Sequence, residues 1–377
     1  MSATLKSSVS TQHSSASTLP GSSKLSSTTK LPITIVTGFL GSGKTTLLRH
    51  ILDNANGRRI AVIVNEFGEL GIDGEILKSC SIGCTEEEAA GRIYELANGC
   101  LCCTVQEEFF PVMRDLVARK SELDHILVET SGLALPKPLV QAIQWPEIRT
   151  ASTVDAVITV VDSPAVAAGQ FAAFPDHVDA QRRADPNLDH ESPLHELFED
   201  QLSAADLVIL NKVDALESDA LAKVRDEIAE ELPENVRIVE AHHGRLPLEL
   251  LLGIAASSED FIDSRPSHHD EEEHEDHDHD AFDSFHVDLP EVKETILMST
   301  LQALASRHPI LRVKGFVAVT GKPMRLLVQG VGRRFERYYD RKWAANEMRK
   351  TRLVFIGQAL DRSVVTTELN DALTAFA

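Results

Sequence analysis

Short runs of apolar and β-branched residues recur from residue 31 to about residue 255, with stretches of helical spacing between them. The runs are Ile33–Thr37, Ile60–Asn65, His125–Glu129, Val154–Val161, Leu207–Leu210 and Val236–Glu240. Their polarity is continuous rather than alternating, which is typical of strands that helices bury on both faces. The pattern therefore predicts an α/β fold with a mostly parallel sheet over residues 31–255.

A second pattern follows after residue 283. Glu291–Arg307 has helical spacing, and the apolar runs around it predict further strands at Phe285–Pro290, Ile310–Thr320, Met324–Gly330 and Arg352–Ile356. Strands arranged around a helix without regular alternation predict a small α+β domain over residues 284–360. Residues 361–377 are assigned to a C-terminal tail.

Two segments lack any such pattern. Residues 1–30 contain 16 Ser or Thr and no acidic residue, and residues 268–280 consist only of His, Asp and Glu. Neither composition can bury enough apolar surface to offset the entropy of ordering. We expect a disordered tail over 1–30 and a solvated linker over 256–283. The Ser-rich bias of the tail also suits a transit peptide, but its lack of Arg favours a plain tail.

Composition narrows the classes of function. The chain has 377 residues, of which 43% are hydrophobic, so a sizeable core can form and a fully disordered protein is excluded. No apolar run reaches about 18 residues, so no membrane span is expected. The net charge of −21 argues against a general nucleic-acid binder, which needs a basic surface.

All five cysteines lie between Cys80 and Cys103. A secreted, disulfide-rich protein would be small and would distribute its cysteines along the chain. Reduced thiols in the cytoplasm, used for metal or redox chemistry, fit this clustering better.

The first apolar run leads into GFLGSGKT, which fits the pattern G-x-x-x-x-G-K-[ST], and Thr45–Leu52 then has helical spacing. In such a P-loop, backbone N–H groups surround the β-phosphate at a helix N-terminus. Lys44 is expected to reach the β- and γ-phosphates, and the Thr45 hydroxyl to hold Mg²⁺. A tight glycine turn without a ligand is the alternative, which the flanking strand and helix disfavour. The expected nucleotide contacts here are Gly38, Gly41, Ser42, Gly43, Lys44, Thr45 and Thr46.

A second acidic residue should help to hold the metal. Glu129 ends an apolar run and is followed by Thr130-Ser131-Gly132. A carboxylate at the carboxyl end of a neighbouring strand points toward the phosphates, whereas the alternative is a charge in solvent. Gly132 can donate its N–H to a γ-phosphate. The expected catalytic residues are therefore Lys44, Thr45 and Glu129.

Asn211-Lys212-Val213-Asp214 follows a buried run and fits N-K-x-D, the base-reading pattern of GTPases. The carboxylate of Asp214 can accept two hydrogen bonds from guanine, and adenine offers no matching donors. An unpaired buried acceptor is costly, so the pattern favours GTP over ATP. Asn211, Lys212, Asp214 and Gly132 complete the expected nucleotide contacts. Ala241–Gly244 is a weaker candidate for a loop that stacks on the base.

Cys100, Cys102 and Cys103 place three thiols within four residues. Thiols this close suit a soft or borderline divalent metal, although inert buried cysteines are the common alternative. Glu66 and Glu69 lie on the expected loop after the second run, where they contact Mg²⁺-bound water, the transported metal or only solvent. Cys80 and Cys84 are a weaker pair that could supplement the thiol site or merely pack.

These motifs together resemble the CobW family of P-loop GTPases. The matching segments are Thr37–Thr46, Asn65–Gly68, Asn98–Cys103, Glu129–Gly132 and Asn211–Asp214, and the C-terminal part resembles the C-terminal domain of that family. The resemblance covers about 31–360. It implies a GTP-hydrolysing metallochaperone with GTP and Mg²⁺ as ligands and a client metalloenzyme as partner.

The runs Glu129–Trp145, Ser163–Gly169 and Leu311–Gly332 resemble the cobalamin-biosynthesis branch of the family. That likeness implies that Co²⁺ is bound in the Mg–GTP state and delivered to the cobaltochelatase. Thiols alone do not select Co²⁺ over Zn²⁺, so a zinc-trafficking GTPase that feeds a zinc enzyme is the alternative. A passive metal-buffering protein is a further alternative, and the sequence leaves a homodimer open.

Overall fold

The computed structural model describes residues 30–65, 93–96, 109–172, 178, 194–234, 236–253, 282–332, 334–344 and 347–374. All five cysteines, Glu66 and Glu69 lie outside these residues, as does nearly all of the expected N-terminal tail and of the acidic linker. Within the described ranges, none of the helices has the length and apolar character needed to cross a bilayer.

The N-terminal part is built on a seven-stranded sheet in the order β3-β2-β4-β1-β5-β6-β7. Its strands are β1 (Leu31–Thr37), β2 (Ile60–Asn65), β3 (Ile93–Leu96), β4 (His125–Glu129), β5 (Ser152–Asp162), β6 (Leu207–Asn211) and β7 (Arg237–Ala241). Every neighbouring pair is parallel, which confirms the predicted parallel α/β fold. The edge strand β3 was not predicted from the sequence, because its four residues IYEL make no continuous apolar run.

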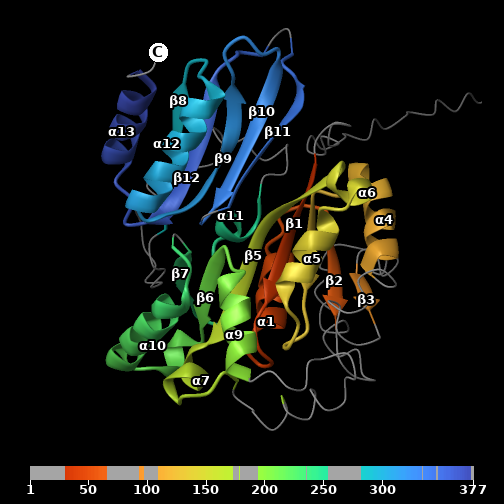
Figure 1. Cartoon of the computed structure of the whole chain (residues 1–377), viewed down its shortest axis with the longest axis vertical. Coiled ribbons are helices and arrows are strands. Elements are labelled where there is room, and N and C mark those ends of the chain that lie inside the picture. Colours follow the sequence, from red (N-terminus) through yellow and green to blue (C-terminus); the bar gives the residue numbers. More distant parts are fainter. Residues whose placement is uncertain are drawn as a thin grey trace, which may run out of the picture.

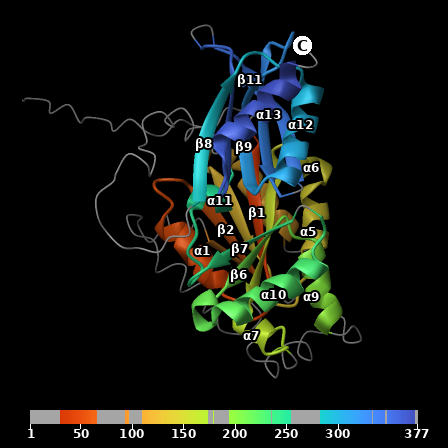
Figure 2. The same ribbon diagram turned by 90° about the vertical axis from the view of Figure 1, so that its left-hand side faces the viewer.

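Helices cover both faces of this sheet (Figures 1 and 2). They are α1 (Lys44–Asp53), α4 (Phe110–Ala118), α5 (Pro136–Ile143), α6 (Pro146–Arg149), α7 (Ser163–Ala167), α9 (Leu194–Ser203), α10 (Ser218–Glu231) and α11 (Leu248–Leu251). Leucines of α1 and α11 pack on one face, whereas α4 and α5 bury their apolar sides on the other. α9 and α10 cover β5 and β6 in a third cluster. Burial on both faces explains why the strands read as continuous apolar runs.

The C-terminal part is an antiparallel sheet in the order β11-β10-β9-β12-β8, with two helices (Figure 1). Its elements are β8 (Phe282–Leu289), α12 (Glu294–Arg307), β9 (Ile310–Ala318), β10 (Met324–Val331), β11 (Arg334–Lys342), β12 (Thr351–Gln358) and α13 (Arg362–Thr374). The sequence pattern missed β11, because this edge strand is rich in charge and only partly buried.

Residues 361–377 were expected to form a tail, but most of them form α13. Val365 and Leu369 lie one helical turn apart and are fully buried in the C-terminal core, next to leucines of α12. Only two apolar positions of the helix are buried, so its helical periodicity is weak in the sequence.

A buried ion pair joins the two parts. Arg312 on β9 donates three hydrogen bonds of 3.0 Å to the carboxylate of Asp155 on β5, and its Nε donates to Leu250 O at 2.9 Å. Both charged side chains have no exposed surface. A second pair at the junction links Arg334 Nε to Asp206 Oδ2 at 2.6 Å. Truncating one partner of a buried pair is costly, so these contacts fix how the parts sit together.

His125 on β4 lies beside the Asp155–Arg312 pair. Its Nε2 is 2.8 Å from Thr34 Oγ1, and Thr34 in turn donates to Asp155 at 3.4 Å. Burial lowers the pKa of His125 to about 4, so the ring is neutral near pH 7. Burial opposes ionisation of Asp155, but the charge of Arg312 still holds the pKa of this carboxyl below its ordinary value.

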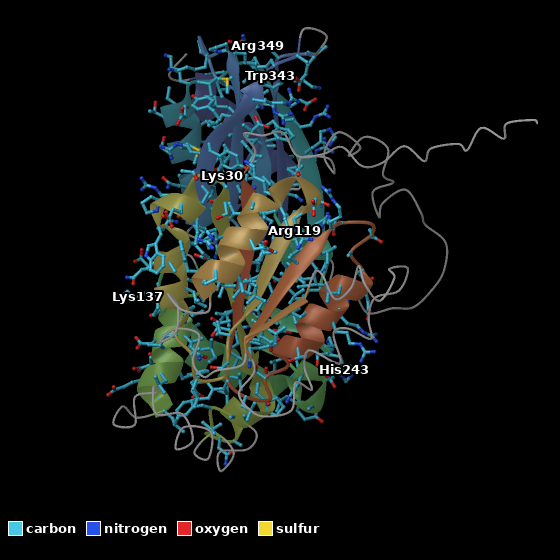
Figure 3. All side chains as sticks on the ribbon, turned by 90° about the vertical axis from the view of Figure 1, so that its right-hand side faces the viewer. Lys30, Arg119, Lys137, His243, Trp343 and Arg349 are labelled. Carbon is cyan, nitrogen blue, oxygen red and sulfur yellow. The ribbon has the colours of Figure 1, made fainter. Side chains whose placement is uncertain are left out.

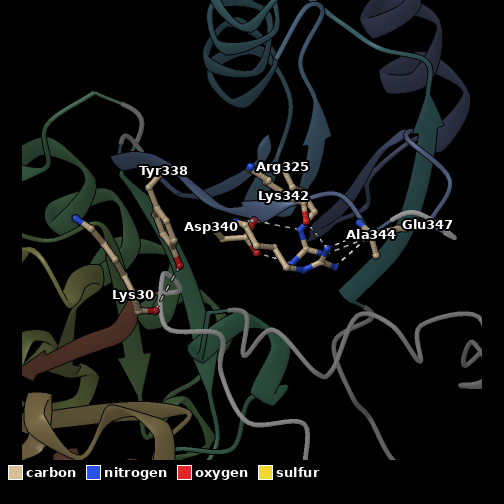
Figure 4. A network of polar contacts seen from close by, with 8 residues as sticks. Lys30, Arg325, Tyr338, Asp340, Lys342, Ala344 and Glu347 are labelled. Carbon is tan, nitrogen blue, oxygen red and sulfur yellow. Dashed lines mark hydrogen bonds and ion pairs between the residues drawn. The ribbon is translucent and has the colours of Figure 1, made fainter. Parts of the chain in front are cut away.

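A polar network covers the opposite end of β10 and β11 (Figure 4). Arg325 donates to both oxygens of the buried Asp340, and its guanidinium lies 3.6 Å from the ring centroid of Phe316. Arg341 and Glu347 extend the network toward the surface. In Figure 3, Lys30 lies where the two parts meet, and Trp343 and Arg349 lie at the far end of the C-terminal part.

Candidate functional site

The loop between β1 and α1 has the backbone of a phosphate-binding loop. Gly38 has a φ of +136°, and a Cβ on it would lie 2.1 Å from the carbonyl oxygen of Val160 on β5. Only glycine allows this close approach of the loop to the neighbouring strand. The loop therefore turns tightly around the N-terminus of α1, where backbone N–H groups and the helix dipole favour an anion.

Two side chains of the P-loop motif lie at the start of α1. Lys44 is buried, and its Nζ donates to the carbonyl oxygens of Gly38 at 2.9 Å and Phe39 at 3.2 Å. The hydroxyl of Thr45 donates to Glu129 Oε1 at 3.0 Å. The structure thus brings together the P-loop and the acidic residue at the end of β4.

The residues around Thr45 and Glu129 fit a bound Mg²⁺. A hydroxyl and a buried carboxylate within hydrogen-bond distance supply the hard oxygen ligands that this ion prefers. Thr45 and Glu129 would hold the ion, which supplies charge neutralisation on the nucleotide phosphates when bound.

The segment after Glu129 is held against the P-loop strand. Thr130 N donates to Val36 O at 3.0 Å, and its hydroxyl donates to the hydroxyl of Thr37 at 2.9 Å. A Cβ on Gly132 would lie 2.7 Å from the backbone nitrogen of Leu40. The backbone of Gly132 therefore packs directly on the P-loop, and the absence of a side chain is needed there.

The N-K-x-D residues lie at the same end of the sheet. Asn211 Nδ2 donates to Ser42 O at 2.8 Å, and Asn211 Oδ1 accepts from the backbone N–H of Gly244 at 2.9 Å. Asn211 thus ties the P-loop to the turn after β7. Lys212 donates to Asp162 at 2.6 Å, and Asp162 also caps α7 by accepting from Ala165 N. Sequence analysis missed Asp162, although its position at the end of the run before the N-K-x-D strand was a usable signal.

The carboxylate of Asp214 is partly exposed at the edge of this region, with a side-chain exposure of 40%. Two imidazole nitrogens face it, His242 Nδ1 and His243 Nε2, each at 3.7 Å from one carboxylate oxygen. Figure 3 shows His243 at the end of the molecule away from the C-terminal part. The candidate loop for base stacking and the base-reading carboxylate therefore lie side by side.

The structure also identifies a residue that no motif indicated. Gln201 on α9 is fully buried, and its Nε2 donates to the carbonyl oxygens of Gly132 and Ala134, each at 3.1 Å. A single glutamine in an amphipathic helix carries no local signal, because the contact forms only in the folded chain.

The expected metal ligands are Cys100, Cys102, Cys103, Glu66 and Glu69, and all of them lie outside the described residues. In the part of the chain that the structure does describe, no three His, Cys, Asp or Glu side chains come together as a metal site. The thiol site therefore stays a prediction from the sequence.

Two family models match the chain. The model of the CobW/HypB/UreG nucleotide-binding domain matches residues 32–240. The model of the C-terminal domain of the cobalamin synthesis protein CobW matches residues 284–373, a range that includes most of α13.

Several characterised proteins are similar over nearly their whole length. A Pseudomonas aeruginosa protein named zinc chaperone CobW is 74% identical, over 91% of this chain and 92% of that protein. A Sinorhizobium protein of the same name is 52% identical, over 87% of this chain and 93% of that protein. The Escherichia coli zinc chaperone YjiA is 30% identical, over 87% of this chain and 94% of that protein.

Proposed function

Because the chain belongs to the CobW family of P-loop GTPases, we propose that it is a metallochaperone that binds a divalent metal ion while it carries GTP. Hydrolysis of GTP then releases the ion to a client enzyme. The observation that carries the nucleotide half of this proposal is the hydrogen bond between Thr45 and Glu129, which joins the P-loop to the neighbouring strand.

Each residue of the site has a task that follows from its contacts. Lys44 exchanges its two carbonyl partners in the loop for phosphate oxygens, so its charge stays paired. Asn211 keeps the P-loop and the turn after β7 in register, and Asp214 accepts hydrogen bonds from guanine. Gly132 offers its N–H to the γ-phosphate, which distinguishes GTP from GDP.

The cargo site is proposed at Cys100, Cys102 and Cys103. Cys100 follows Leu96, the last residue of β3, by four residues, and four residues of chain span at most about 14 Å. The carboxyl ends of all strands in a parallel sheet lie at one edge, so this limit supports a thiol site near the nucleotide edge. Glu66 follows the last residue of β2, the neighbour of β4, which supports a role beside Glu129 for Glu66 and, less directly, Glu69.

Zn²⁺ is the cargo that the comparisons favour, because two highly similar relatives carry the name zinc chaperone. Three thiolates suit Zn²⁺ and leave a fourth position of its tetrahedron open for transfer. Co²⁺ delivery to a cobaltochelatase is the second candidate, which the match to the C-terminal domain of the cobalamin synthesis protein favours. The client is then a zinc enzyme or the cobaltochelatase, and the cytoplasmic location follows only from the clustered thiols.

A metal competition with the GTP-loaded protein tests the cargo. Equal total Zn²⁺ and Co²⁺ are offered to the protein carrying a hydrolysis-resistant GTP analogue, and the bound metals are quantified. An excess of bound Zn²⁺ supports the first candidate, and an excess of bound Co²⁺ supports the second.

Phosphate release tests the GTPase itself. The wild-type protein is expected to release phosphate from GTP, and Lys44→Ala to lose about a hundredfold in kcat, since one donor to the transferred phosphate contributes on that scale. No turnover in the wild-type protein would favour a passive metal buffer instead.

A further inference from the structure

We propose that Gln201 is a positioning residue for GTP hydrolysis: its buried amide holds the Gly132 segment against the P-loop, in the position where this segment contacts the γ-phosphate. The inference rests on the proposed GTPase function and adds a residue on α9 to the nucleotide-sensing machinery. The hydrogen bonds of its amide go to Gly132 and Ala134, so Gln201 acts through the backbone of residues 132–134.

The contacts of Gln201 are specific to the sensing segment. The two N–H groups of its amide serve the carbonyl oxygens of Gly132 and Ala134 at 3.1 Å each, while the side chain has no exposed surface. Its backbone carbonyl accepts from the hydroxyl of Thr159 on β5 at 2.9 Å. The bond from Thr159 holds the backbone of α9 against the sheet at this residue, and the two bonds of the amide orient it toward the segment after β4.

The Gly132 segment is clamped between two surfaces. On one side its backbone touches Leu40 of the P-loop, where an added Cβ would come within 2.7 Å. On the other side, the amide of Gln201 binds the carbonyl groups of residues 132 and 134, the first and third of this segment. Fixing the carbonyls fixes the peptide planes, because the peptide bond is planar. The N–H of Gly132 belongs to the preceding peptide plane, which is held by a bond of 3.1 Å from Ala134 N to Ser131 O. That plane adjoins the one that Gln201 fixes, so the N–H of Gly132 is set before the nucleotide arrives.

The same helix also contacts the P-loop by a second route. Phe198, one turn before Gln201, packs edge-on against Phe39 with ring centroids 5.7 Å apart, and Phe171 joins this cluster. α9 therefore touches both structures that surround the γ-phosphate position. A shift of α9 changes the P-loop and the Gly132 segment together, which is the geometry needed to pass the nucleotide state to other parts of the chain.

The role of Gln201 predicts a selective effect on the triphosphate. GDP lacks the γ-phosphate and gains nothing from an ordered Gly132 N–H, whereas GTP loses one hydrogen bond when the segment is free. Losing the donors of Gln201 should weaken binding of a triphosphate about tenfold, the typical value of one hydrogen bond to a charged group, and leave GDP binding within about twofold.

Two substitutions test this role. Gln201→Leu keeps the approximate volume and removes both donors. Gln201→Glu is isosteric, but its carboxylate faces two carbonyl oxygens and repels them when ionised. When protonated, it can donate one hydrogen bond, so acidification should restore part of its kcat relative to the wild-type protein. Gln329→Leu is the matched control, because Gln329 on β10 is also buried but lies at the junction of the two parts.

The measurements are the dissociation constants of GDP and of a hydrolysis-resistant GTP analogue, with kcat and KM from phosphate release. For Gln201→Leu we expect a lower kcat and about a tenfold rise in the dissociation constant of the GTP analogue divided by that of GDP. For Gln329→Leu we expect no change in this ratio. Both constants are measured on one preparation, so partial loss of folded protein does not alter their ratio. If Gln201→Leu does not fold, the same rise in the ratio is expected for Gln201→Glu.

An equal loss of affinity for both nucleotides, or no change in either, would overturn the role of Gln201. The absence of acid rescue in Gln201→Glu would count against it as well. A wild-type protein that binds GTP and releases no phosphate would instead overturn the proposed function, and the two failures are therefore separable.

Discussion

At the scale of single residues, the proposed function makes base recognition depend on one carboxylate, that of Asp214. It lies partly exposed at the end of β6, with two imidazoles facing its oxygens. Around it, Asn211 and Lys212 serve the protein itself, by bonds to Ser42, Gly244 and Asp162. We therefore expect Asp214 alone to select the purine, within a frame that the bonds of Asn211 and Lys212 hold in place.

The substitution Asp214→Asn should shift the nucleotide preference from GTP toward xanthosine triphosphate. An amide can accept from guanine N1–H but loses the second, charge-assisted bond, so GTP affinity should fall tenfold to about a hundredfold. Xanthosine triphosphate, which presents a carbonyl at that position, should gain affinity. The measurement is a titration with both nucleotides, and Asp219→Asn, an exposed aspartate at the start of α10, is the control. Unchanged affinities for both nucleotides would place the base elsewhere.

His125 gives the protein a defined sensitivity to acid. Its pKa is about 4 when folded and near 6.5 in the unfolded chain, so below about pH 6.5 only the unfolded state takes up the proton. The free energy of unfolding should therefore fall by about 1.4 kcal/mol per pH unit between pH 6.5 and 4 because of this site.

In His125→Gln, the loss of stability between pH 7.5 and pH 5 should be smaller by about 2 kcal/mol. Urea unfolding at the two pH values measures it. The exposed His286→Gln should show the same loss as the wild-type protein. A His125→Gln variant that follows the wild-type curve would show that the ring is not kept neutral in the folded state.

The residues of the proposed nucleotide site could be proposed from the sequence, because each belongs to a short motif at the end of an apolar run. Lys44, Thr45 and Asn211 depend on local geometry, so their spacing alone identifies them. Asp162 and Gln201 were not predictable in this way. Their partners lie about 50 and 70 residues away in sequence, and only the packing of α9 and the pairing of β5 with β6 bring them together.

At the scale of elements, apolar runs identified every central strand and the edge strands β7 and β8, but they missed the edge strands β3 and β11. β3 has only four residues, and β11 is rich in charge and only partly buried, so the apolar pattern of both is weak. Helix α13 was also missed, because only two of its side chains are buried and its apolar pattern is weak. The sequence therefore predicts central elements better than peripheral ones.

The burial of α13 has a direct test. Leu369→Ala removes a fully buried side chain from the C-terminal core and should lower the free energy of unfolding by about 2–4 kcal/mol. Val364→Ala, at an exposed position of the same helix, should cost less than about 0.5 kcal/mol. Chemical denaturation of both variants gives the comparison, and equal stabilities would mean that the segment is a tail.

At the scale of the whole molecule, the two sheets act as one unit because charge and apolar surface cross the junction. Arg312 and Asp155 form the fully buried pair, and Leu311 and Val331 of the C-terminal part belong to the core of the parallel sheet. We therefore expect the two parts to unfold together.

Arg312→Met leaves the Asp155 carboxylate buried and unpaired, which should cost about 3–5 kcal/mol. The double variant Arg312→Met, Asp155→Leu should recover part of that loss. The protein has two tryptophans, Trp145 in the N-terminal part and Trp343 in the C-terminal part. Variants that keep only one tryptophan report the unfolding of each part separately. With Arg312 intact, the two parts should unfold in one coincident transition, and with Arg312→Met in two separate transitions. Coincident transitions in both would show that the pair does not join the parts.

Coupling between the nucleotide and the metal is the central claim, and one measurement tests it most directly. Zn²⁺ affinity is measured by chelator competition with a hydrolysis-resistant GTP analogue, with GDP and without nucleotide. We expect the triphosphate state to bind Zn²⁺ about 5- to 150-fold more tightly than the other two states. Cys102→Ala should lose metal binding and keep nucleotide binding. Equal Zn²⁺ affinity in all three states would contradict the account.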